Sequence, residues 1–304
     1  MRVIVTGAAG GIGRHILNYF GKDFKIVGFD TVQGPEMEHV EWVIGDILDV
    51  DRLTQAARGC DAMIHLAGIP IYNPDRDLDI GRVNIYGMQC AVEAAARAGV
   101  KRFAYASSIC ATSFIFWQER RTPKYFPVDE EYFDMPDDIY GLSKFFNERI
   151  AWAYQRRYGI ETVGLRMATV WLPDHEPTDQ LLRDLLKPEH DDNLKFRDLR
   201  WQYLDVRDAA QAFYLAVTHP KAVGIFNVGA ADSPGGDWRL WVQELYPDVP
   251  VLRQPGEYLA DLTLPLWSIR KLSQEAGYQP KHSWQEYPVF VEELEKYKER
   301  VGAK

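Results

Sequence analysis

Cysteine and positive charge are both scarce in this sequence, and each shortage argues against a class of protein. The three cysteines, Cys60, Cys90 and Cys110, form no CxxC pair, so neither a disulfide framework nor a zinc or other metal site is indicated. The 35 lysines and arginines are outnumbered by 44 aspartates and glutamates, and no basic tract offsets the net charge of −9. Nucleic acid is therefore not expected as a partner, because binding to phosphate requires a clustered basic surface.

Long apolar runs are missing as well. No segment reaches the roughly 18 consecutive apolar residues that predict a membrane span, so no membrane partner is expected. The opening residues, Met1–Gly7, have the pattern of a buried strand rather than of a secretory signal. We therefore expect a cytoplasmic protein, and its 304 residues with 46% hydrophobic content suffice for a large core.

The N-terminal half alternates short β-branched runs with helical stretches. This pattern is typical of a parallel sheet covered on both faces, so the predicted fold class is α/β, a Rossmann-type doubly wound parallel sheet. The predicted strands are Arg2–Thr6, Lys25–Asp30, Val40–Gly45, Ala62–Leu66, Arg102–Ala106 and Thr162–Arg166. The predicted helices include Gly11–Phe20, Val83–Ala98 and Tyr140–Tyr158, the last with Asp137 or Asp138 as its N-cap.

A glycine-rich run follows the first predicted strand and opens the first predicted helix. Glycines in such a turn permit a tight bend, a close approach of the backbone to a pyrophosphate, and packing of the helix on the sheet, while the helix N-terminus favours negative charge. A glycine-rich turn without a ligand is the alternative, but the strand and helix around the run favour a dinucleotide site. The residues predicted to bind the cofactor here are Gly7, Gly10, Gly11, Ile12 and Gly13.

An acidic residue ends the second predicted strand. Asp30 lies seventeen positions after Gly13, where a carboxylate can accept hydrogen bonds from the adenosine ribose and repel the additional phosphate of NADP. A surface aspartate that merely closes a strand is the alternative. NAD is therefore the predicted cofactor.

The alternation of strands and helices is interrupted twice. The segment Thr112–Pro136 is rich in aromatic residues and prolines, which predicts a long irregular insertion, and long loops are more often functional than structural. From Trp171 onward the alternation loosens, before a predicted strand at Gly224–Val228 and a helix at Trp284–Arg300. We interpret residues 1–170, with returns near 201–228, as an NAD-binding domain, and residues 171–304 mainly as a smaller C-terminal substrate-binding lobe.

A tyrosine and a lysine lie one helical turn apart in the predicted helix after the insertion. On one helix face the ammonium of Lys144 would stabilise the phenolate of Tyr140 and lower its pKa from about 10 toward the range for exchanging a proton with an alcohol. Such a pair is common on helices. The serine pair Ser107–Ser108 gives it weight, because it ends a predicted strand at the sheet edge where parallel folds bind ligands.

Further motifs occur along nearly the whole chain in a fixed order. The sequence resembles an extended short-chain dehydrogenase/reductase of the NAD-dependent epimerase/dehydratase family. The motifs that carry the resemblance are Thr6–Gly13, Gly45–Ile47, His65–Gly68, Val83–Asn84 with Gly87, Ala106–Ser108, Tyr140 with Lys144, Leu165–Arg166, Tyr203–Asp208, Ser268, Lys271–Leu272 and Gly277–Pro280.

The resemblance implies a catalytic trio. Tyr140 would be the general acid/base, and Lys144 would lower its pKa and hold the nicotinamide ribose. Ser108 would hydrogen-bond the reacting oxygen, with Ser107 as the alternative register. His65 would be a packed histidine rather than a second base.

The resemblance also implies cofactor contacts outside the glycine run. Asp46 and Ile47 would lie at the adenine, and the backbone of Leu66, Ala67 and Gly68 would pass beside the cofactor. Asn84 would lie near the cofactor or in a proton path, although bonding to neighbouring backbone is an equal alternative. Asp208 would join the two lobes.

The sequence departs from sugar-nucleotide epimerases at the substrate side. Thr169 stands where those enzymes typically have asparagine, Leu172 stands in place of a glycine, and Trp201 stands in place of an arginine, with Arg200 adjacent. These departures weaken the sugar-nucleotide interpretation.

The layout after the serine pair is instead similar to that of uronate dehydrogenases and related sugar 1-dehydrogenases. Uronate dehydrogenases place asparagine and histidine directly after the serines, whereas Ile109 and Cys110 stand here, so uronate itself is not favoured. The residues predicted to contact substrate are Ser107, Ile109, Thr169 and Arg120.

Two sets of side chains near the presumed cleft allow alternative interpretations. Basic residues can clamp a carboxylate or phosphate, or can be solvated charges on a loop; they are Arg120, Arg121, Lys124, Arg183 and Lys187. Aromatic residues can form an apolar wall over a sugar face or an oligomer contact; they are Phe114, Phe116, Trp117 and Trp171.

The leading hypothesis is an NAD-dependent oxidoreductase that transfers hydride from an alcohol carbon of a small sugar-like substrate. The alternative is a sugar-nucleotide epimerase or dehydratase with tightly bound NAD, and a remote alternative is a non-catalytic NAD-sensing protein. The resemblance further implies a homodimer that pairs through the helices holding Asn84 and Tyr140.

Overall fold

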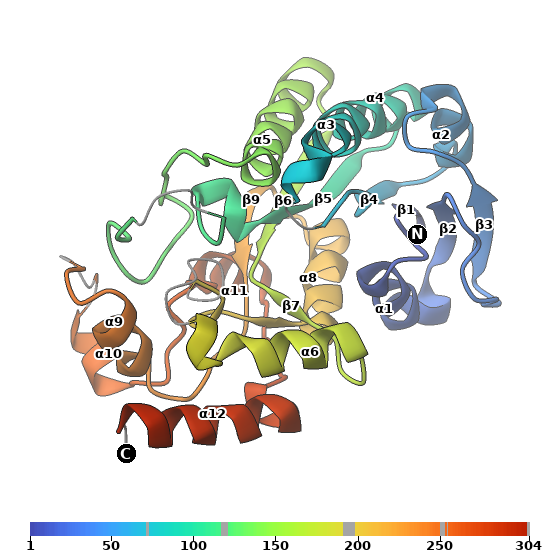
Figure 1. Ribbon diagram of the computed structural model, residues 1–304. Coiled ribbons are helices and arrows are strands. Elements are labelled where there is room, and N and C mark those ends of the chain that lie inside the picture. Colours follow the sequence, from blue (N-terminus) through green and yellow to red (C-terminus); the bar gives the residue numbers. More distant parts are fainter. Residues whose placement is uncertain (71–72, 117–120, 191–197, 250–252, 254, 303–304) are drawn as a thin grey trace.

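The computed structural model describes residues 1–70, 73–116, 121–190, 198–249, 253 and 255–302. Its centre is a seven-stranded parallel sheet with the order β3-β2-β1-β4-β5-β6-β9 (Figure 1). The doubly wound α/β prediction is confirmed, and β5 runs two residues farther than predicted. The strands are β1 (Arg2–Thr6), β2 (Lys25–Asp30), β3 (Val40–Ile44), β4 (Ala62–His65), β5 (Arg102–Ser108), β6 (Glu161–Met167) and β9 (Gly224–Val228).

Unbroken apolar runs explain why these segments form the interior of a parallel sheet. Val3, Ile4 and Val5 of the central strand β1 are completely buried, as expected for a strand covered on both faces. The chain leaves β1 toward β2 and β3 and then returns to place β4 on the other side of β1. This reversal opens a crevice at the carboxyl ends of β1 and β4, which is where open α/β sheets bind ligands.

Helices cover both faces of the sheet (Figure 1). One layer contains α2 (Val50–Ala57), α4 (Gly87–Ala98) and α5 (Ile139–Tyr158), and the other contains α1 (Gly11–Phe20), α8 (Val206–Thr218) and α11 (Arg270–Ala276). The N-cap of α5 is Asp138, whose carboxylate accepts a hydrogen bond of 2.7 Å from the Gly141 N–H. The cap fixes where α5 starts and therefore where Tyr140 lies.

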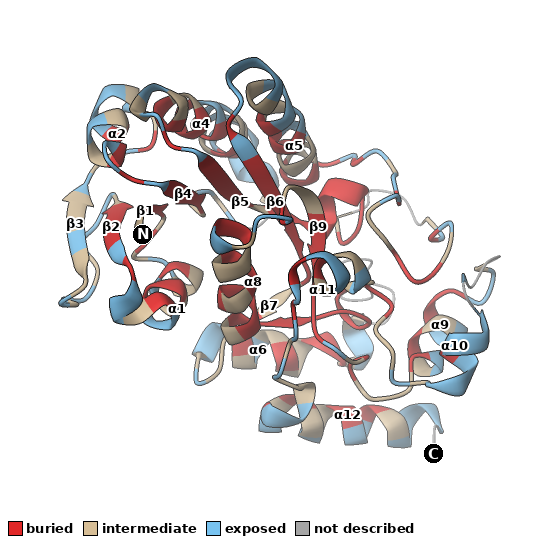
Figure 2. Ribbon diagram, turned by 180° about the vertical axis from the view of Figure 1, so that it is seen from behind, coloured by how far each residue is buried: buried red, intermediate tan, exposed pale blue. Residues whose placement is uncertain are grey.

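A second lobe is built on the parallel pair β7 (Val170–Trp171) and β8 (Leu204–Asp205). It lies on the side of the sheet away from α4 and α5, and buried and exposed positions alternate along its last helix (Figure 2). Its helices are α6 (Glu176–Leu185), α9 (Arg239–Leu245), α10 (Pro255–Ala260) and α12 (Pro288–Val301). Among the described residues, no helix combines the length and apolar character needed to cross a bilayer.

Two predicted helices differ from the observed ones. In place of one helix from Val83, the chain forms the short helix α3 (Asp77–Ile80), a π-helical segment (Gly81–Tyr86) and then α4. The C-terminal helix starts at Pro288 rather than Trp284, because a proline lacks an N–H and favours the first turn of a helix; a 3₁₀ turn precedes it.

The insertion after β5 joins the two parts of the chain. The Val128 N–H donates to the Leu266 carbonyl at 2.7 Å, and the Val128 carbonyl accepts from the Ser268 N–H at 2.9 Å. Asp208 likewise accepts from the backbone N–H groups of Lys281 and His282, both at 2.9 Å. In addition, α8 and β9 complete the sheet although they come after residue 170 in the chain. The predicted division at residue 170 therefore remains a proposal.

Candidate active site

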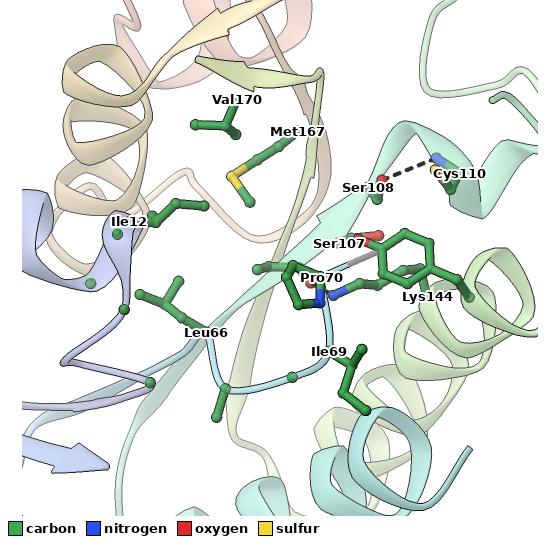
Figure 3. A pocket seen from close by; sticks show the side chains of 18 of the residues that line it. Ile12, Leu66, Ile69, Pro70, Ser107, Ser108, Cys110, Lys144, Met167 and Val170 are labelled. Atoms are coloured by element: carbon green, nitrogen blue, oxygen red, sulfur yellow. Dashed lines mark hydrogen bonds between the residues drawn. The ribbon is translucent and has the colours of Figure 1, made fainter. Parts of the chain in front are cut away.

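A cavity of about 840 Å³ opens at the carboxyl ends of the central strands. Ile12 borders it on one side, and Ser108 and Lys144 border it on the other (Figure 3). The cavity is lined by residues that the sequence predicted for cofactor binding, for catalysis and for substrate binding. They are Gly7, Gly10, Gly11, Ile12, Gly13, Asp30, Asp46, Ile47, Leu66, Ala67, Gly68, Ser107, Ser108, Ile109, Tyr140, Lys144 and Thr169.

The glycine run forms a cradle that side chains would fill. Gly7 has a φ of +73°, and a Cβ added to it would lie 2.7 Å from the Ala67 nitrogen. A Cβ on Gly13 would lie 2.7 Å from the Ala8 carbonyl oxygen. Helix α1 begins at Gly11, so its first N–H groups face the cavity. These features fit the pyrophosphate of a dinucleotide.

Acidic residues lie at the far end of the cradle. Asp30 closes β2 and lines the cavity, and one of its carboxylate oxygens accepts from the Ala9 N–H at 3.0 Å. This bond ties the acid to the glycine turn. Asp46 lines the same end and accepts from the Leu48 N–H at 2.9 Å. Both carboxylates line the same cavity as the cradle and could hold the adenosine half of a dinucleotide.

Asn84 lies behind the cavity wall rather than in it. It is almost fully buried in the π-helical segment, and its carboxamide accepts from the Ile69 N–H at 2.7 Å and donates to the Ile69 carbonyl at 3.0 Å. It also donates to the Ser143 hydroxyl at 3.3 Å. Asn84 therefore fixes the wall beside the cofactor site to the helix that holds Tyr140, which corresponds to the backbone-bonding alternative.

Tyr140, Lys144 and Ser108 converge at the carboxyl end of β5. The Lys144 ammonium donates to the Ala106 carbonyl at 2.9 Å and lies 5.5 Å from the centre of the Tyr140 ring. The Ser108 hydroxyl accepts from the Cys110 N–H at 3.2 Å (Figure 3). Helix α5 and strand β5 thus bring together three groups that can act on one alcohol oxygen by hydrogen bonding or proton transfer.

Burial dominates the electrostatics of this trio. It raises the pKa of the Tyr140 phenol well above its ordinary value, and only a hydrogen bond with Ser108 acts to lower it. Burial also lowers the pKa of Lys144 to about 8. The lowered tyrosine pKa predicted from the spacing is therefore not found in this structure, because the phenol is desolvated and the Lys144 ammonium donates to the Ala106 carbonyl instead.

The neighbouring polar residues are engaged in the core. The Ser107 hydroxyl donates to Glu148 at 2.8 Å, and Glu148 forms a buried ion pair of 2.8 Å with Arg166. This engagement supports Ser108 as the hydroxyl that serves the reacting oxygen. His65 bonds Thr6 at 2.8 Å, and burial lowers its pKa to about 3, so it is a packed neutral histidine, as the sequence predicted.

Comparison with known proteins agrees with this geometry. Residues 3–229 match the model of the NAD dependent epimerase/dehydratase family. The chain belongs to this family. It is 30% identical to the uronate dehydrogenase of Pseudomonas putida over 254 residues, which cover 77% of the chain and 91% of the relative. It is 34% identical to the L-arabinose 1-dehydrogenase (NAD(P)(+)) of Haloferax volcanii over 177 residues, covering 56% of the chain and 67% of the relative.

Solved structures share the fold of this family member. The crystal structure of UDP-glucuronic acid 4-epimerase from Bacillus cereus in complex with NAD has a TM-score of 0.67 and 20% identity, and the match covers 98% of this chain and 99% of the other. A short-chain dehydrogenase/reductase superfamily protein from Agrobacterium tumefaciens with bound NAD has a TM-score of 0.67 and 21% identity, covering 99% and 98%.

We call the part of the cavity that is lined by residues of 109–116, 167–172 and 199 the substrate end, and its lining is mainly apolar. The apolar residues are Ile109, Ile115, Phe116, Met167, Val170 and Leu199. Thr169, which the sequence predicted to contact substrate, lines the cavity, and so do the polar residues His175 and Thr178. Of the predicted aromatic wall, Phe116 lines the cavity, whereas Phe114 and Trp171 are buried in the core and Trp117 lies outside the described residues.

The basic residues considered for a substrate clamp are paired elsewhere. Arg121 forms an ion pair of 2.8 Å with Asp137, and Lys187 forms one of 2.6 Å with Asp184. Arg183 pairs with Glu176 at 3.7 Å, Lys124 with Asp134 at 3.7 Å, and Arg200 donates to the Leu185 carbonyl at 2.9 Å. Arg120 lies outside the described residues.

Sequence reasoning missed the buried polar residues behind the substrate end. Asp198 and Gln202 hydrogen-bond the backbone of Ile115 and Thr169, respectively. Neither residue belongs to a motif, and their partners are 83 and 33 positions away. No local pattern in the sequence signals such contacts.

Proposed function

We propose that this chain is an NAD-dependent oxidoreductase that removes hydride from an alcohol carbon of a sugar-like substrate. The observation that carries the proposal is the convergence of Ser108, Tyr140 and Lys144 in the cavity that the glycine cradle also lines. A general acid/base, a hydrogen-bond donor for the reacting oxygen and a dinucleotide cradle in one space fit alcohol oxidation.

Each residue of the trio has a distinct task. Ser108 binds the substrate oxygen and orients the alcohol, and Tyr140 takes the hydroxyl proton or returns it in the reverse direction. Lys144 is charged below its pKa of about 8 and favours the phenolate whenever the phenol gives up its proton. NAD, when bound, supplies the hydride acceptor.

The cradle and Asp30 support NAD rather than NADP. Asp30 at the end of β2 lines the cavity and would accept hydrogen bonds from the ribose hydroxyls of a dinucleotide held in the cradle, and its charge would repel an added phosphate. The relative from Haloferax volcanii is named as using NAD(P)(+), so its name does not favour either cofactor, and the preference for NAD proposed here rests on Asp30.

The apolar substrate end supports a neutral sugar rather than a uronate or a sugar phosphate. Among the described residues that line the cavity, Lys144 is the single lysine or arginine. Ile109 and Cys110 follow the serines, and an apolar surface packs against the C–H face of a sugar ring without pairing a charge. The curated relatives include uronate and L-arabinose dehydrogenases, and this wall favours the second kind of substrate.

Spectrophotometry tests the proposal directly. Purified protein with NAD is given aldoses, uronates, sugar phosphates and polyols, and NADH is followed by its near-ultraviolet absorbance. Sustained NADH formation with a neutral sugar is the expected result. Conversion of a nucleotide sugar with no net NADH would instead identify the alternative, an epimerase or dehydratase that retains its NAD.

A substitution of the general acid/base distinguishes an enzyme from a non-catalytic NAD-binding protein. Tyr140→Phe removes the proton-transfer group and is expected to lower kcat by roughly 10²–10⁴-fold, with the dissociation constant for NAD unchanged. Unaltered turnover in this variant would contradict the assigned acid/base.

We also propose a homodimer that pairs through α5 and the neighbouring helix segments. Trp152 and Phe146 on α5 are 57% and 43% exposed, and Tyr86 and Leu78 beside them are 53% and 91% exposed. A pair of such faces would remove this apolar surface from water. Sedimentation of Trp152→Glu, with Leu259→Glu on α10 as the control, is expected to show loss of the dimer only in the first variant.

The cytoplasmic location stays part of the proposal. Its support is that Cys60, Cys90 and Cys110 are all free and buried, as suits a reducing compartment.

A further inference from the structure

One wall of the substrate end has a backbone conformation that must be held in place. Ile115 has a φ of +87°, which is rare for a β-branched residue because its Cβ crowds the backbone. Ile115 and the adjacent Phe116 line the cavity, and the Phe116 ring lies 5.8 Å from the Tyr140 ring at an interplanar angle of 86°. Such strain persists only where surrounding contacts fix it, and it concentrates at functional sites.

Asp198 supplies the contact that fixes Ile115. Its side chain is completely buried, and one carboxylate oxygen accepts a hydrogen bond of 3.1 Å from the Ile115 N–H. The other oxygen accepts from the Tyr246 hydroxyl, which in turn accepts from the Trp201 indole at 3.2 Å. Asp198 thereby ties the Ile115 wall to the second lobe.

Gln202, from the same segment as Asp198, holds a second part of the cavity wall. Its carboxamide oxygen accepts from the Thr169 N–H at 2.7 Å, and its amide donates to the Thr169 hydroxyl oxygen at 2.9 Å. The same amide donates to the Asp198 carbonyl at 3.3 Å, which links the two supports. Because the Thr169 oxygen accepts this bond, its hydroxyl hydrogen is available to another acceptor, such as a substrate oxygen in the cavity.

We propose that Asp198 and Gln202 are positioning residues that fix the separation and orientation of the two walls, Ile115–Phe116 and Thr169. Neither side chain lines the cavity, so both act through the residues that they hold. The pair sets which sugars fit beside Tyr140, and in this respect the inference rests on the proposed oxidoreductase function.

Two variants of Asp198 separate positioning from bulk stability. Asp198→Ala removes the acceptor, so Ile115 relaxes and Phe116 moves relative to Tyr140; kcat/KM for the preferred sugar is expected to fall about 10²-fold. Asp198→Asn keeps an oxygen that accepts from the Ile115 N–H, and its amide can donate to the Tyr246 hydroxyl oxygen. This variant is therefore expected to restore most of that loss. The dissociation constant for NAD is expected to be unchanged in both variants.

A matched control and a second readout keep the test independent of turnover. Asp184→Asn removes a carboxylate on α6 that pairs with Lys187 at the surface, and it is expected to leave kcat/KM unchanged. Hydrogen exchange of the Ile115 amide is measured in parallel, and it is expected to be slow in the wild type and fast in Asp198→Ala. This readout can be measured even if the wild type forms no NADH. In that case the proposed function fails, but the role of Asp198 in holding Ile115 is still tested.

Several results would overturn the inference. An Ile115 amide that stays protected in Asp198→Ala would do so, as would an unchanged kcat/KM and an unchanged ranking of sugars. Should Asp198→Ala fail to fold, Tyr246→Phe removes one hydroxyl that bonds Asp198 and leaves the ring packing. A smaller fall in kcat/KM with unaltered NAD affinity is then expected, and no change in kcat/KM would refute the role.

Discussion

The two ends of the cavity are built in different ways. The cofactor end comes from one contiguous stretch, Gly7–Gly13, whose backbone shapes the cradle, together with acids at the ends of strands. The substrate end comes from segments far apart in the chain, 109–116, 167–172 and 198–202, and it is shaped by side chains held by buried hydrogen bonds. The first end therefore follows from local sequence, whereas the second depends on packing.

This difference predicts different responses to substitution. Where a glycine of the cradle faces other backbone, as Gly7 and Gly13 do, no side chain can move aside, so one added methyl group damages the cradle. When a side chain in the wall of the substrate end is truncated, the free energy of unfolding changes little, whereas the choice of substrate changes. The largest expected effect therefore belongs to the cofactor end.

Two alanine substitutions in the cradle test this sensitivity. Gly13→Ala would place a Cβ 2.7 Å from the Ala8 carbonyl oxygen, so the backbone must shift; we expect a loss of about 2–3 kcal/mol in unfolding free energy and weaker NAD binding. Gly10→Ala is the control, because its Cβ would lie 3.3 Å from the nearest atom, the Gly7 carbonyl oxygen. Calorimetry and NAD titration measure both quantities. Equal losses in the two variants would contradict a backbone cradle.

Removal of the buried ammonium is expected to stabilise the protein. Burial lowers the pKa of Lys144 to about 8 from an ordinary value near 10.5, so the folded state binds its proton less tightly than the unfolded state. At pH 7 the charged form costs stability, and Lys144→Met is expected to raise the unfolding free energy by about 2 kcal/mol after loss of the Ala106 hydrogen bond, while turnover is lost.

The sign of this effect can be checked by pH. The cost is fully present below pH 8 and declines as pH rises from 8 toward 10.5, so the difference in Tm between wild type and variant should shrink over that window. A difference that is constant with pH would contradict the electrostatic origin.

Two substitutions of Ile115 measure the strain in the substrate wall. Both Ile115→Gly and Ile115→Ala remove the branched side chain, but only glycine adopts a φ of +87° without cost. The glycine variant is therefore expected to be more stable than the alanine variant by about 1 kcal/mol in denaturant unfolding. The reverse order would show that the wall is not strained.

The smallest expected effect concerns the pH profile. Burial raises the pKa of Asp138 to about 6, so above that pH its negative charge disfavours the Tyr140 phenolate. Asp138→Asn keeps an acceptor for the Gly141 N–H and removes the charge, which lowers the pKa of Tyr140 and moves the corresponding limb of kcat/KM to lower pH. Asp137→Asn, which removes a neighbouring carboxylate paired with Arg121, is expected to leave the profile in place.

The strands of the sheet were predicted correctly, because each is a short run of consecutive, mainly apolar residues. The glycine run and the Tyr140/Lys144 pair were identified from a few consecutive residues or one helical turn, and the roles assigned to them stay predictions. The helices predicted from Val83 and Trp284 differ from the observed ones, although their patterns are also local. The raised pKa of Tyr140 escaped prediction because it depends on how deeply α5 and β5 bury the phenol. Asp198 and Gln202 escaped it because their partners lie in other parts of the chain.

The position of β9 has a consequence for synthesis of the chain. This strand pairs with β6 at one edge of the sheet, yet it comes 57 residues after β6 ends, and α8, which covers β4 to β6, comes only shortly before it. While the ribosome makes the first 200 residues, β6 has an unpaired edge, and the face of the sheet that α8 later covers carries only α1 among the described helices. The nascent chain therefore exposes apolar surface until residue 228 emerges, and this interval is when chaperones are expected to bind it.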